Sequence, residues 1–381
     1  MYDVLYDVRP LQTASRLRGI GTVTRQLIEA LSRVDRENRY LLLRWSRRPS
    51  PELALAPDFA HRWLEVSRCP QRHLGWLWDR VLLAFALSRR AEVGHFLSPF
   101  DLEMGWPSWG VIGGMRQLVM AYDTHPLSGS RDVLQGKHRL LAPLFAWMGG
   151  QLRAAAALTC ISHTTADDVH AHAGVPRERL HVTPLAVDAR FTVRHQPEID
   201  RFCARAELQR PYLLYVGGAN PNKNLPGFLE AIARTDVPHV VLAVPSSARG
   251  ELEARAGALG ISGRLTFLSG VSDEDLPLLY AGARQVALPS LQEGFGLPVL
   301  EAMASGAPVV CSDIPALHEV GADAAAYFPP RDVALMARVI GGVWGDADRR
   351  AAMRAAGLVR AGAFTWDACA HKVMEVYRSS C

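Results

Sequence analysis

The sequence predicts a parallel α/β protein with two domains. Strand-like apolar segments alternate with helical patterns from one end of the chain to the other, and this alternation is typical of βαβ units in parallel sheets. With 381 residues the chain is long enough for two domains that each bury their own core. A hydrophobic content of 49% beside 21% charged residues is that of an ordinary globular protein.

The predicted elements of the first half begin with a strand over 4–8, which is followed by a loop and a helix from about Thr22. A further strand over 118–122 ends in polar residues, and a short strand over 181–185 closes this half. Residues 188–210 show no clear period and are predicted to connect the domains. No internal repeat or low-complexity tract is visible.

The second half restarts with a buried strand over 212–216, which is followed at once by Gly217 and Gly218. Further strands are predicted over 240–244, 265–268, 286–288 and 308–311, with helical patterns between them. A last helix ends near Tyr377. Because ligands of open parallel sheets bind at the carboxyl ends of strands, the loops after these strands are the candidate sites.

Charge and targeting signals narrow the class of protein. Residues 1–190 carry 24 basic against 18 acidic residues, and the net charge of the whole chain is +4. This mild basic excess fits binding to an anionic acceptor or to a membrane surface. It is much smaller than the basic excess of proteins that bind nucleic acids. The six scattered cysteines have no metal-ligand spacing, and neither a signal peptide nor a membrane span is visible, so we expect reduced thiols in a cytoplasmic protein.

Lysine is rare in this chain, which has 39 arginines and lysines only at 137, 223 and 372. In such a sequence, Lys223 within a Gly-rich loop indicates that a compact point charge is needed there. The alternative is a solvated loop lysine. The spacing of a Walker phosphate loop is missing around it.

The most informative stretch runs from 285 to 306. An apolar strand over 285–288 is followed by Pro-Ser, and a Gly-x-Gly turn from Gly294 to Gly296 then leads into a helix. Pro298 suits the first helical turn, where its missing N–H costs nothing, and Gly306 suits the position just past the helix end. The turn would therefore expose backbone N–H groups beside the positive end of a helix, which is a site for phosphate.

Two carboxylates accompany this predicted phosphate site. Glu293 lies in the loop and Glu301 about one turn inside the helix, so that both can face one pocket. Carboxylates repel phosphate but accept hydrogen bonds from sugar hydroxyls. The pattern therefore predicts a nucleotide-sugar site. The alternative for either glutamate is a helix N-terminal carboxylate that the helix dipole stabilises by roughly 0.3–1 kcal/mol.

The run Glu-Gly-Phe-Gly-Leu-Pro, with Glu-Ala-Met-Ala, a glycine and Pro-Val-Val after it, resembles the signature of the retaining GT-B glycosyltransferases of family 4. The two glutamates stand eight positions apart, as in that family. The likeness also takes in Arg18-Gly19-Ile20-Gly21, the segment 181–191, the loop from Tyr215 to Asn224, and Phe364-Thr365-Trp366 before the last helix. It covers essentially the whole chain and is strongest over 180–325.

The resemblance implies a GT-B fold, in which two Rossmann-like domains turn their parallel sheets towards a central cleft. Residues 1–190 would form the N-terminal domain and bind the acceptor. Residues 205–360 would form the C-terminal domain and bind the nucleotide-sugar, and a helix over 361–381 would cross back onto the N-terminal domain.

The resemblance also assigns roles in the donor site. Lys223 would pair with the diphosphate, Glu301 would accept hydrogen bonds from the ribose hydroxyls, and Glu293 would hold the donor sugar and the developing charge at its anomeric carbon. The other donor-binding candidates are loop positions: Gly19, Gly21, Gly218, Gly294, Phe295, Gly296 and Leu297. Many relatives carry an arginine where this chain has Gly218, so another arginine or backbone donors must help here. For Gly19 and Gly21, an ordinary strand-to-helix turn is the alternative.

Acceptor-side candidates lie at the end of the strand over 118–122. In relatives this strand end commonly reads His-Asp, whereas this chain has Tyr122 and Asp123, with His125 two residues later. The resemblance implies that Asp123 positions the acceptor, while His125 either compensates for the missing histidine or caps a loop. Ser162 matches the family's strand-end serine, and a helix N-cap is an equally good interpretation.

The implied reaction is metal-independent glycosyl transfer with retention at the anomeric carbon, without a cofactor. The catalytic candidates are Glu293, Asp123 and Lys223, and no Asp-x-Asp metal motif is present. By analogy with the subgroup, we expect a mannose-type donor and a glycan or lipid-linked acceptor in surface-polysaccharide synthesis. The alternatives are a nucleotide-sugar epimerase and a catalytically silent nucleotide-sugar binder that serves as an assembly partner.

Aromatic and basic residues gather in the first half, with Trp45, Trp63, Trp76 and Trp78 among seven arginines between 44 and 80. Such a combination can dock a domain on anionic lipid at the inner face of the cell membrane. The alternative is that the helix over 76–87 packs in the core.

Overall fold

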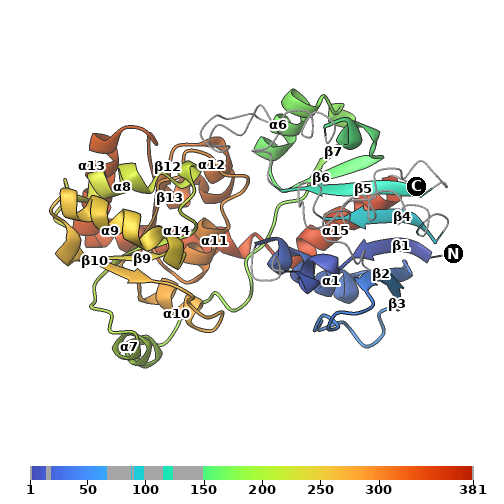
Figure 1. Ribbon diagram of the computed structural model, residues 1–381, viewed down its shortest axis with the longest axis horizontal. Helices are drawn as coiled ribbons and strands as arrows, with labels where there is room; N and C mark the ends of the chain where they lie inside the picture. Colours follow the sequence, from blue (N-terminus) through green and yellow to red (C-terminus); the bar gives the residue numbers. More distant parts are fainter. Residues whose placement is uncertain are drawn as a thin grey trace. The chain divides into compact units, whose positions relative to one another are not determined.

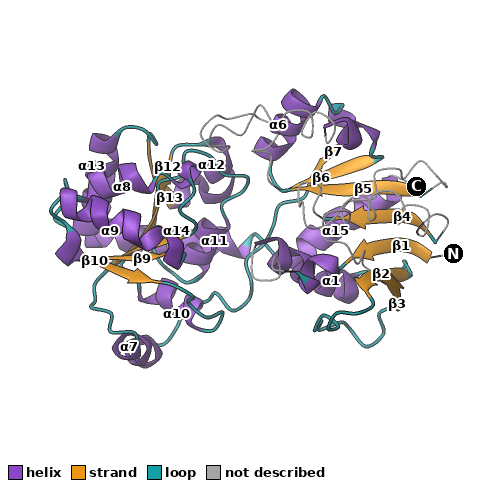
Figure 2. Cartoon of the chain, viewed as in Figure 1, coloured by secondary structure: helices purple, strands orange, loops and turns teal. Residues whose placement is uncertain are grey.

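The computed structural model describes residues 2–13, 19–66, 87, 90–97, 115–122 and 149–379, and these divide into two compact units. The first unit comprises residues up to Leu185 together with those from Thr365 onwards, and the second runs from Ala186 to Phe364. Figures 1 and 2 show each unit as a sheet of strands with helices packed on it. Each unit is an α/β structure with parallel strands.

The sheet of the first unit has seven parallel strands in the order β3-β2-β1-β4-β5-β6-β7. Its strands are β1 (Tyr2–Asp7), β2 (Tyr40–Trp45), β3 (His61–Val66), β4 (Ala91–Phe96), β5 (Arg116–Ala121), β6 (Ala157–Cys160) and β7 (Leu180–Val182). Its helical segments are η1 (Arg9–Gln12), α1 (Gly19–Val34), α6 (His163–Ala173), η3 (Arg177–Arg179) and α15 (Trp366–Ser379).

The sheet of the second unit has six parallel strands in the order β10-β9-β8-β11-β12-β13. Its strands are β8 (Leu213–Val216), β9 (Val240–Ala243), β10 (Leu265–Leu268), β11 (Gln285–Leu288), β12 (Val309–Ser312) and β13 (Ala325–Phe328). Its α-helices are α7 (Gln196–Arg205), α8 (Leu225–Ile232), α9 (Arg249–Ala258), α10 (Asp275–Gly282), α11 (Leu297–Ala304), α12 (Pro315–Gly321), α13 (Val333–Gly345) and α14 (Ala347–Gly362). Short 3₁₀ turns complete it: η4 (Pro221–Lys223), η5 (Ser246–Ala248), η6 (Ser262–Arg264) and η7 (Ala322–Ala324).

Both sheets follow the doubly wound order in which the chain starts in the middle, builds outwards on one side and then returns to the other. The predicted parallel α/β class is therefore confirmed. In each unit the order reverses between two neighbouring strands, β1 and β4 in the first and β8 and β11 in the second. The loops after such a pair diverge, and ligands of this fold class bind in the crevice between them.

Burial explains why these segments form strands. Strands β6, β9, β11 and β12 are buried at every position, which is why their sequences are mostly apolar instead of alternating, with Thr159, Gln285 and Ser312 as buried exceptions. Each unit has its own core, built around residues such as Leu5 and Val119 in the first and Phe228 and Val310 in the second.

The C-terminal helix α15 belongs to the first unit, where it packs against α1 (Figure 1). A buried hydrogen bond of 2.7 Å joins the Tyr377 hydroxyl on α15 to His95 Nδ1 on β4. Burial lowers the pKa of His95 to about 3, so the ring is neutral near pH 7. Ion pairs at the surface, Arg33 with Asp367 and Arg378 with Glu37, also join α15 to the first unit.

Three predictions about elements need correction. The connection predicted over 188–210 contains α7, whose buried Ile199 and Phe202 face α10 in a segment too short to show a clear period. The strand predicted over 181–185 is β7, Leu180–Val182. Finally, Trp45 is 1% exposed and lies in the core with the Arg9 and Arg48 guanidinium groups near its ring, so its ring is not available to a membrane surface. Trp76 and Trp78 lie outside the described residues.

In the part of the chain that the structure describes, no helix has both the length and the apolar character needed to cross a bilayer.

Candidate functional site

The candidate donor site lies at the switch point of the second sheet. Strands β8 and β11 are parallel neighbours, with Leu213 opposite Gln285 and Leu214 opposite Val286. Their carboxyl ends therefore meet at one edge, and the loops that follow carry Lys223 and Glu293. The two loops are joined directly, because Leu291 donates its N–H to the Asn222 carbonyl at 2.7 Å and the Asn222 amide donates to the Gln292 carbonyl at 3.3 Å.

Lys223 and Glu293 form an ion pair between these loops. The ammonium lies 2.7 Å from Glu293 Oε1 and 2.8 Å from Oε2, and the Ser290 hydroxyl donates to Oε1 at 2.6 Å. The Lys223 side chain is 23% exposed and that of Glu293 11%, so the pair is at the edge of the interior. The structure therefore does not support the interpretation of Lys223 as a freely solvated lysine. It also shows that the two predicted donor ligands neutralise each other here.

The turn before α11 has the conformation that the sequence predicts. Gly296 caps the helix with φ of +108°, and a side chain there would meet Leu317 Cδ2 at 2.6 Å, so only glycine fits. Pro298 lies in the first turn. At the other end, Gly306 adopts φ of +77° and donates its N–H to the Met303 carbonyl, and Ala307 bonds back to Ala302, which closes the helix as a Schellman motif.

Glu301 lies on α11 and accepts a hydrogen bond of 2.8 Å from the Tyr280 hydroxyl of α10. Burial raises the pKa of Glu301 to about 7; the Tyr280 bond and the Arg190 charge lower it, and the Asp188 charge raises it. As a whole residue, Glu301 is half-buried. A carboxyl group with a pKa near 7 titrates in the range in which a binding site would work, which is typical of functional positions.

Three further donor candidates, Phe295, Gly218 and Leu297, lie in the loops and the helix start around this site. The Phe295 ring is 5% exposed and packs edge-on against Phe364, at 6.1 Å between ring centroids. The Gly218 carbonyl accepts a bond of 2.6 Å from the Tyr215 hydroxyl, which holds the loop after β8. Leu297 is half-buried at the start of α11.

The first unit contains the remaining candidates. Gly19 and Gly21 were expected in a turn before a helix from Thr22, but they lie in the first turn of α1 itself. Tyr122 follows β5, and burial raises the pKa of its hydroxyl, which has no hydrogen-bond partner among the described residues. Ser162 caps α6 and accepts the Thr165 N–H at 2.9 Å, as the N-cap interpretation predicts. Asp123 and His125 lie outside the described residues.

Comparison with known proteins identifies the family. A model described as "Glycosyltransferase Family 4" matches residues 17–191, and one described as "Glycosyl transferases group 1" matches 198–359. The chain belongs to glycosyltransferase family 4. The family that the sequence motifs suggested is therefore confirmed.

Two curated relatives illustrate the similarity of this family 4 chain. The O-antigen chain mannosyltransferase B of Escherichia coli is 35% identical over 218 residues, which are 53% of this chain and 55% of the relative. The MMP alpha-(1->4)-mannosyltransferase of Mycolicibacterium hassiacum is 31% identical over 280 residues, or 67% and 64% of the two chains. The matches thus span between about half and two thirds of these relatives.

The fold is similar to solved structures over its whole length. Anabaena Alr3699/HepE, crystallised in complex with UDP-glucose, superposes with a TM-score of 0.74 over 100% of both chains at 15% sequence identity. At this identity the likeness concerns the fold alone, and it supports the GT-B class for this chain.

Three side chains that the sequence interpretation missed lie in the candidate donor region of this family 4 chain. Ser290 and Tyr280 hold the two glutamates, as described above. Arg190 lies close enough to influence Glu301 and is held by Asp188 at 3.1 Å and by the Asp273 backbone carbonyl at 3.0 Å. Ser290 stands three residues before Glu293 and could have been noticed, whereas Tyr280 and Arg190 come near Glu301 only through folding.

In the described residues, no three or more His, Cys, Asp or Glu side chains gather as a metal-binding group would require.

Proposed function

We propose that this chain is a retaining glycosyltransferase that moves a hexose, with mannose favoured, from a nucleotide-diphosphate sugar to a glycan or lipid-linked glycan. The observation that carries the proposal is the junction of the loops after β8 and β11, where Lys223 meets Glu293 beside the N-terminus of α11. Cation, carboxylate and helix N-terminus are the groups that a diphosphate-linked sugar requires.

In the proposed donor complex, the diphosphate lies at the Gly294–Gly296 turn and the start of α11. Lys223 then shares its charge between Glu293 and the diphosphate, which becomes more negative as the glycosidic bond breaks. Preorganised donors of this kind commonly lower a barrier by several kcal/mol. The reaction needs no metal in this proposal, because these groups supply the positive field.

Glu301 accepts hydrogen bonds from the ribose hydroxyls in this proposal, and Glu293 holds hydroxyls of the donor sugar. Neither acts as a nucleophile in this proposal, because both contact hydroxyl groups of the donor instead of attacking its anomeric carbon. The departing phosphate takes the proton of the acceptor hydroxyl, while Asp123 positions the acceptor. Domain closure would exclude water and favour transfer over hydrolysis.

The mannose preference is supported by the two mannosyltransferase relatives, and the nucleotide-sugar donor by the UDP-glucose complex of a protein with the same fold. We further propose that the enzyme works in the cytoplasm, where its nucleotide-sugar donor would be found. When the acceptor is lipid-linked, it would work at the inner face of the cell membrane.

A catalytically silent nucleotide-sugar binder is the alternative that specific observations favour. Gly218 replaces the arginine of many relatives, and Lys223 is neutralised by Glu293, which leaves less free positive charge for the diphosphate. Such a binder would bind the donor without transferring it to any acceptor.

The first experiment is a thermal-shift screen against UDP-, GDP-, ADP- and dTDP-sugars. A ligand at a hundred times its dissociation constant adds about 2.7 kcal/mol of stability, which moves the unfolding midpoint by a few degrees. A shift with one nucleotide that Glu301→Ala abolishes supports the donor site. Product from that donor with an unchanged anomeric configuration by NMR supports retention. Donor binding without transfer to any of a panel of lipid-linked and soluble glycans would favour the silent binder.

A further inference from the structure

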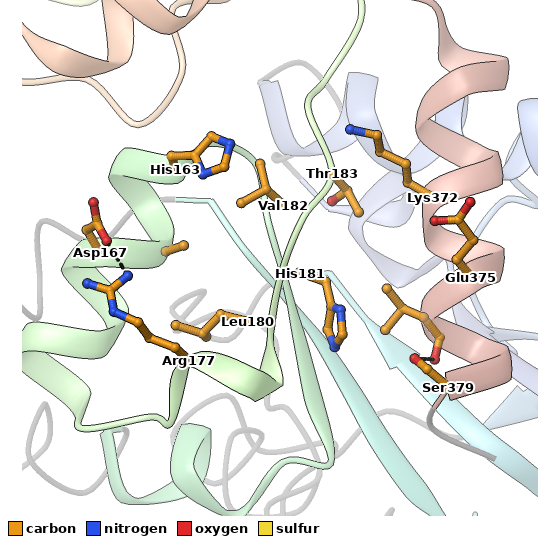
Figure 3. A pocket seen from close by; sticks show the side chains of 12 residues that line it. His163, Asp167, Arg177, Leu180, His181, Val182, Thr183, Lys372, Glu375 and Ser379 are labelled. Carbon is orange, nitrogen blue, oxygen red and sulfur yellow. Dashed lines mark hydrogen bonds and ion pairs between the residues drawn. The ribbon is translucent and has the colours of Figure 1, made fainter.

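A cavity of about 620 Å³ opens in the first unit between α6, β7 and the last turns of α15. Figure 3 shows side chains from these three segments around it. Its size is within the range of about 300–1,000 Å³ that is usual for small-molecule sites. All the residues that line it belong to the first unit, whereas Lys223, Glu293 and Glu301 belong to the second, so it is no part of the donor site.

Two unpaired charges of opposite sign line this cavity. Lys372 and Glu375 stand one turn apart on α15, and neither has a hydrogen bond or ion pair within the described parts of the chain. Lysine on the N-terminal side of glutamate is the less favourable order for pairing along a helix. Figure 3 shows the Lys372 side chain extending from α15 towards the side of β7 that carries Thr183. The other charges of the lining, Arg177 and Asp167, are joined at 2.6 Å and cancel.

A buried hydroxyl provides an independent sign of a ligand. Thr183 lines the same cavity and is 1% exposed, and its Oγ1 has no hydrogen-bond partner in the residues that the structure describes. Buried polar groups are nearly always satisfied in native proteins, so an orphaned hydroxyl at a cavity wall calls for a bound group.

The remaining lining suits a sugar ring. Val376 on α15 supplies apolar surface, against which the C–H groups of a ring can pack, and Leu180 and Val182 add more on the side of β7 that faces α6 (Figure 3). His181 extends from the other side of β7, towards α15, and burial lowers its pKa, so the imidazole is neutral at pH 7 and offers one donor and one acceptor. A wall that combines apolar surface with polar groups is typical of sites for small hydroxylated ligands.

We propose that this cavity binds an anionic sugar, whose phosphate or carboxylate group contacts Lys372 and the Thr183 hydroxyl while its ring hydroxyls contact Glu375 and His181. A bare anion would be repelled by Glu375, and a neutral sugar would leave Lys372 without a counter-charge. The inference rests on the proposed function where it takes this sugar as part of the acceptor, which would then be an acidic or phosphorylated glycan. Binding of an anionic sugar in the cavity does not depend on glycosyl transfer.

The test is calorimetric titration of the full chain with mannose 6-phosphate, glucuronate, mannose and inorganic phosphate. We expect mannose 6-phosphate or glucuronate to bind at least tenfold more tightly than mannose or phosphate, and the stronger of the two identifies the anionic group. Lys372→Ala should weaken that binding at least tenfold. The matched control is Arg36→Ala, which removes the same charge from the first unit at a residue outside the cavity, paired with Asp58.

Glu375→Gln provides a second, opposite readout. It should weaken binding of the anionic sugar and strengthen that of inorganic phosphate, because it removes the repulsion of a bare anion. The proposal is overturned if none of the sugars binds, if phosphate binds as tightly as the anionic sugars, or if Lys372→Ala and Arg36→Ala behave alike. If the anionic sugars do not bind as expected while nucleotide-sugars still shift the unfolding midpoint, the donor proposal stands and the cavity proposal falls. If the anionic sugars bind as expected and no nucleotide-sugar shifts the midpoint, only the donor proposal falls.

Discussion

The Lys223 ammonium contacts both carboxylate oxygens of Glu293, although seventy positions separate the two residues in sequence. The pair places opposite charges at the point where we expect a diphosphate-linked sugar. A donor that binds here must draw Lys223 partly away from Glu293, because one ammonium group serves both anions. This competition gives the two residues distinguishable effects on binding and turnover.

Replacing Lys223 by alanine should weaken the binding of a nucleotide diphosphate between tenfold and a hundredfold. Hydrogen bonds to charged groups contribute about 1.5–3 kcal/mol, which corresponds to that range. Isothermal titration calorimetry measures the effect, with Arg249→Ala as a control that removes an exposed cation of the same unit from its pair with Glu253. Equal affinities of Lys223→Ala and the parent protein would remove the diphosphate assignment.

Replacing Glu293 by glutamine should leave nucleotide diphosphate affinity unchanged or increase it, because Lys223 is then free to bind the phosphates. Transfer should fall at least tenfold, since the carboxylate that holds the donor sugar is lost. The glutamine oxygen can still accept the Ser290 hydroxyl, so the loop should keep its shape. Separate measurements of the dissociation constant and of kcat check both effects. A variant that transfers at the parental rate contradicts the role of Glu293.

The raised pKa of Glu301 predicts that donor binding depends on pH. The ionised carboxylate is the better acceptor for ribose hydroxyls, so affinity for a nucleotide-sugar should rise as the pH passes through about 7. Tyr280→Phe removes a bond that favours the ionised form and should move this midpoint upwards. In Glu301→Gln the dependence should disappear, and a midpoint that persists there belongs to another group. A nucleotide-sugar is the suitable probe, because it has no terminal phosphate that titrates near pH 6.

The same raised pKa has a defined effect on stability. The folded protein holds the Glu301 proton more tightly than the unfolded chain, whose glutamates have pKa values of about 4.3. The contribution of Glu301 to stability is therefore full below that value and is lost as the pH rises to about 7. Glu301→Gln should remove this loss, so its unfolding midpoint should fall less than that of the parent between pH 5 and pH 8. Parallel midpoints across that range would show that Glu301 is not perturbed.

Gly296→Ala should lower the free energy of unfolding of the second unit by about 1–3 kcal/mol, because a side chain there forces an unfavourable φ and meets Leu317. Differential scanning calorimetry should show a lower midpoint and weaker stabilisation by donor. Gly341→Ala is the matched control: the added methyl meets no atom within 4 Å in the interior of α13, and it should stabilise slightly. Similar effects of the two substitutions would contradict the special conformation of Gly296.

Tyr377→Phe should destabilise the first unit by about 1–3 kcal/mol, because it leaves the buried His95 Nδ1 without its partner. Chemical denaturation followed by tryptophan fluorescence would report the loss. Ser379→Ala serves as a control, since its hydroxyl bonds only to its own helix, at the Val376 carbonyl. A loss no larger than that of the control would mean that the buried bond contributes little to the docking of α15.

Much of the second unit could be predicted because its signals are local. Strand β10 was predicted with its observed ends, and β9, β11 and β12 to within a residue. The caps of α11 follow from single residues, Pro298 and Gly306, whose backbone preferences act within one turn. Helix α7 was missed, because ten residues with only a few buried side chains leave a weak periodic pattern. Trp45 was misplaced because an aromatic residue among arginines looks the same in sequence whether the ring is buried or exposed.

The sequence by itself determined the parallel α/β class, the glycine turn before α11 and the family of the chain, since each depends on residue types at short spacing. Only the tertiary structure decided which side chains meet. Lys223 reaches Glu293 because β8 and β11 are parallel neighbours, and Tyr280 reaches Glu301 because α10 packs beside α11. Likewise, Lys372 and Thr183 share one cavity because α15 returns to the first unit. Such contacts join residues distant in sequence and arise from the packing of whole elements, which no local pattern specifies.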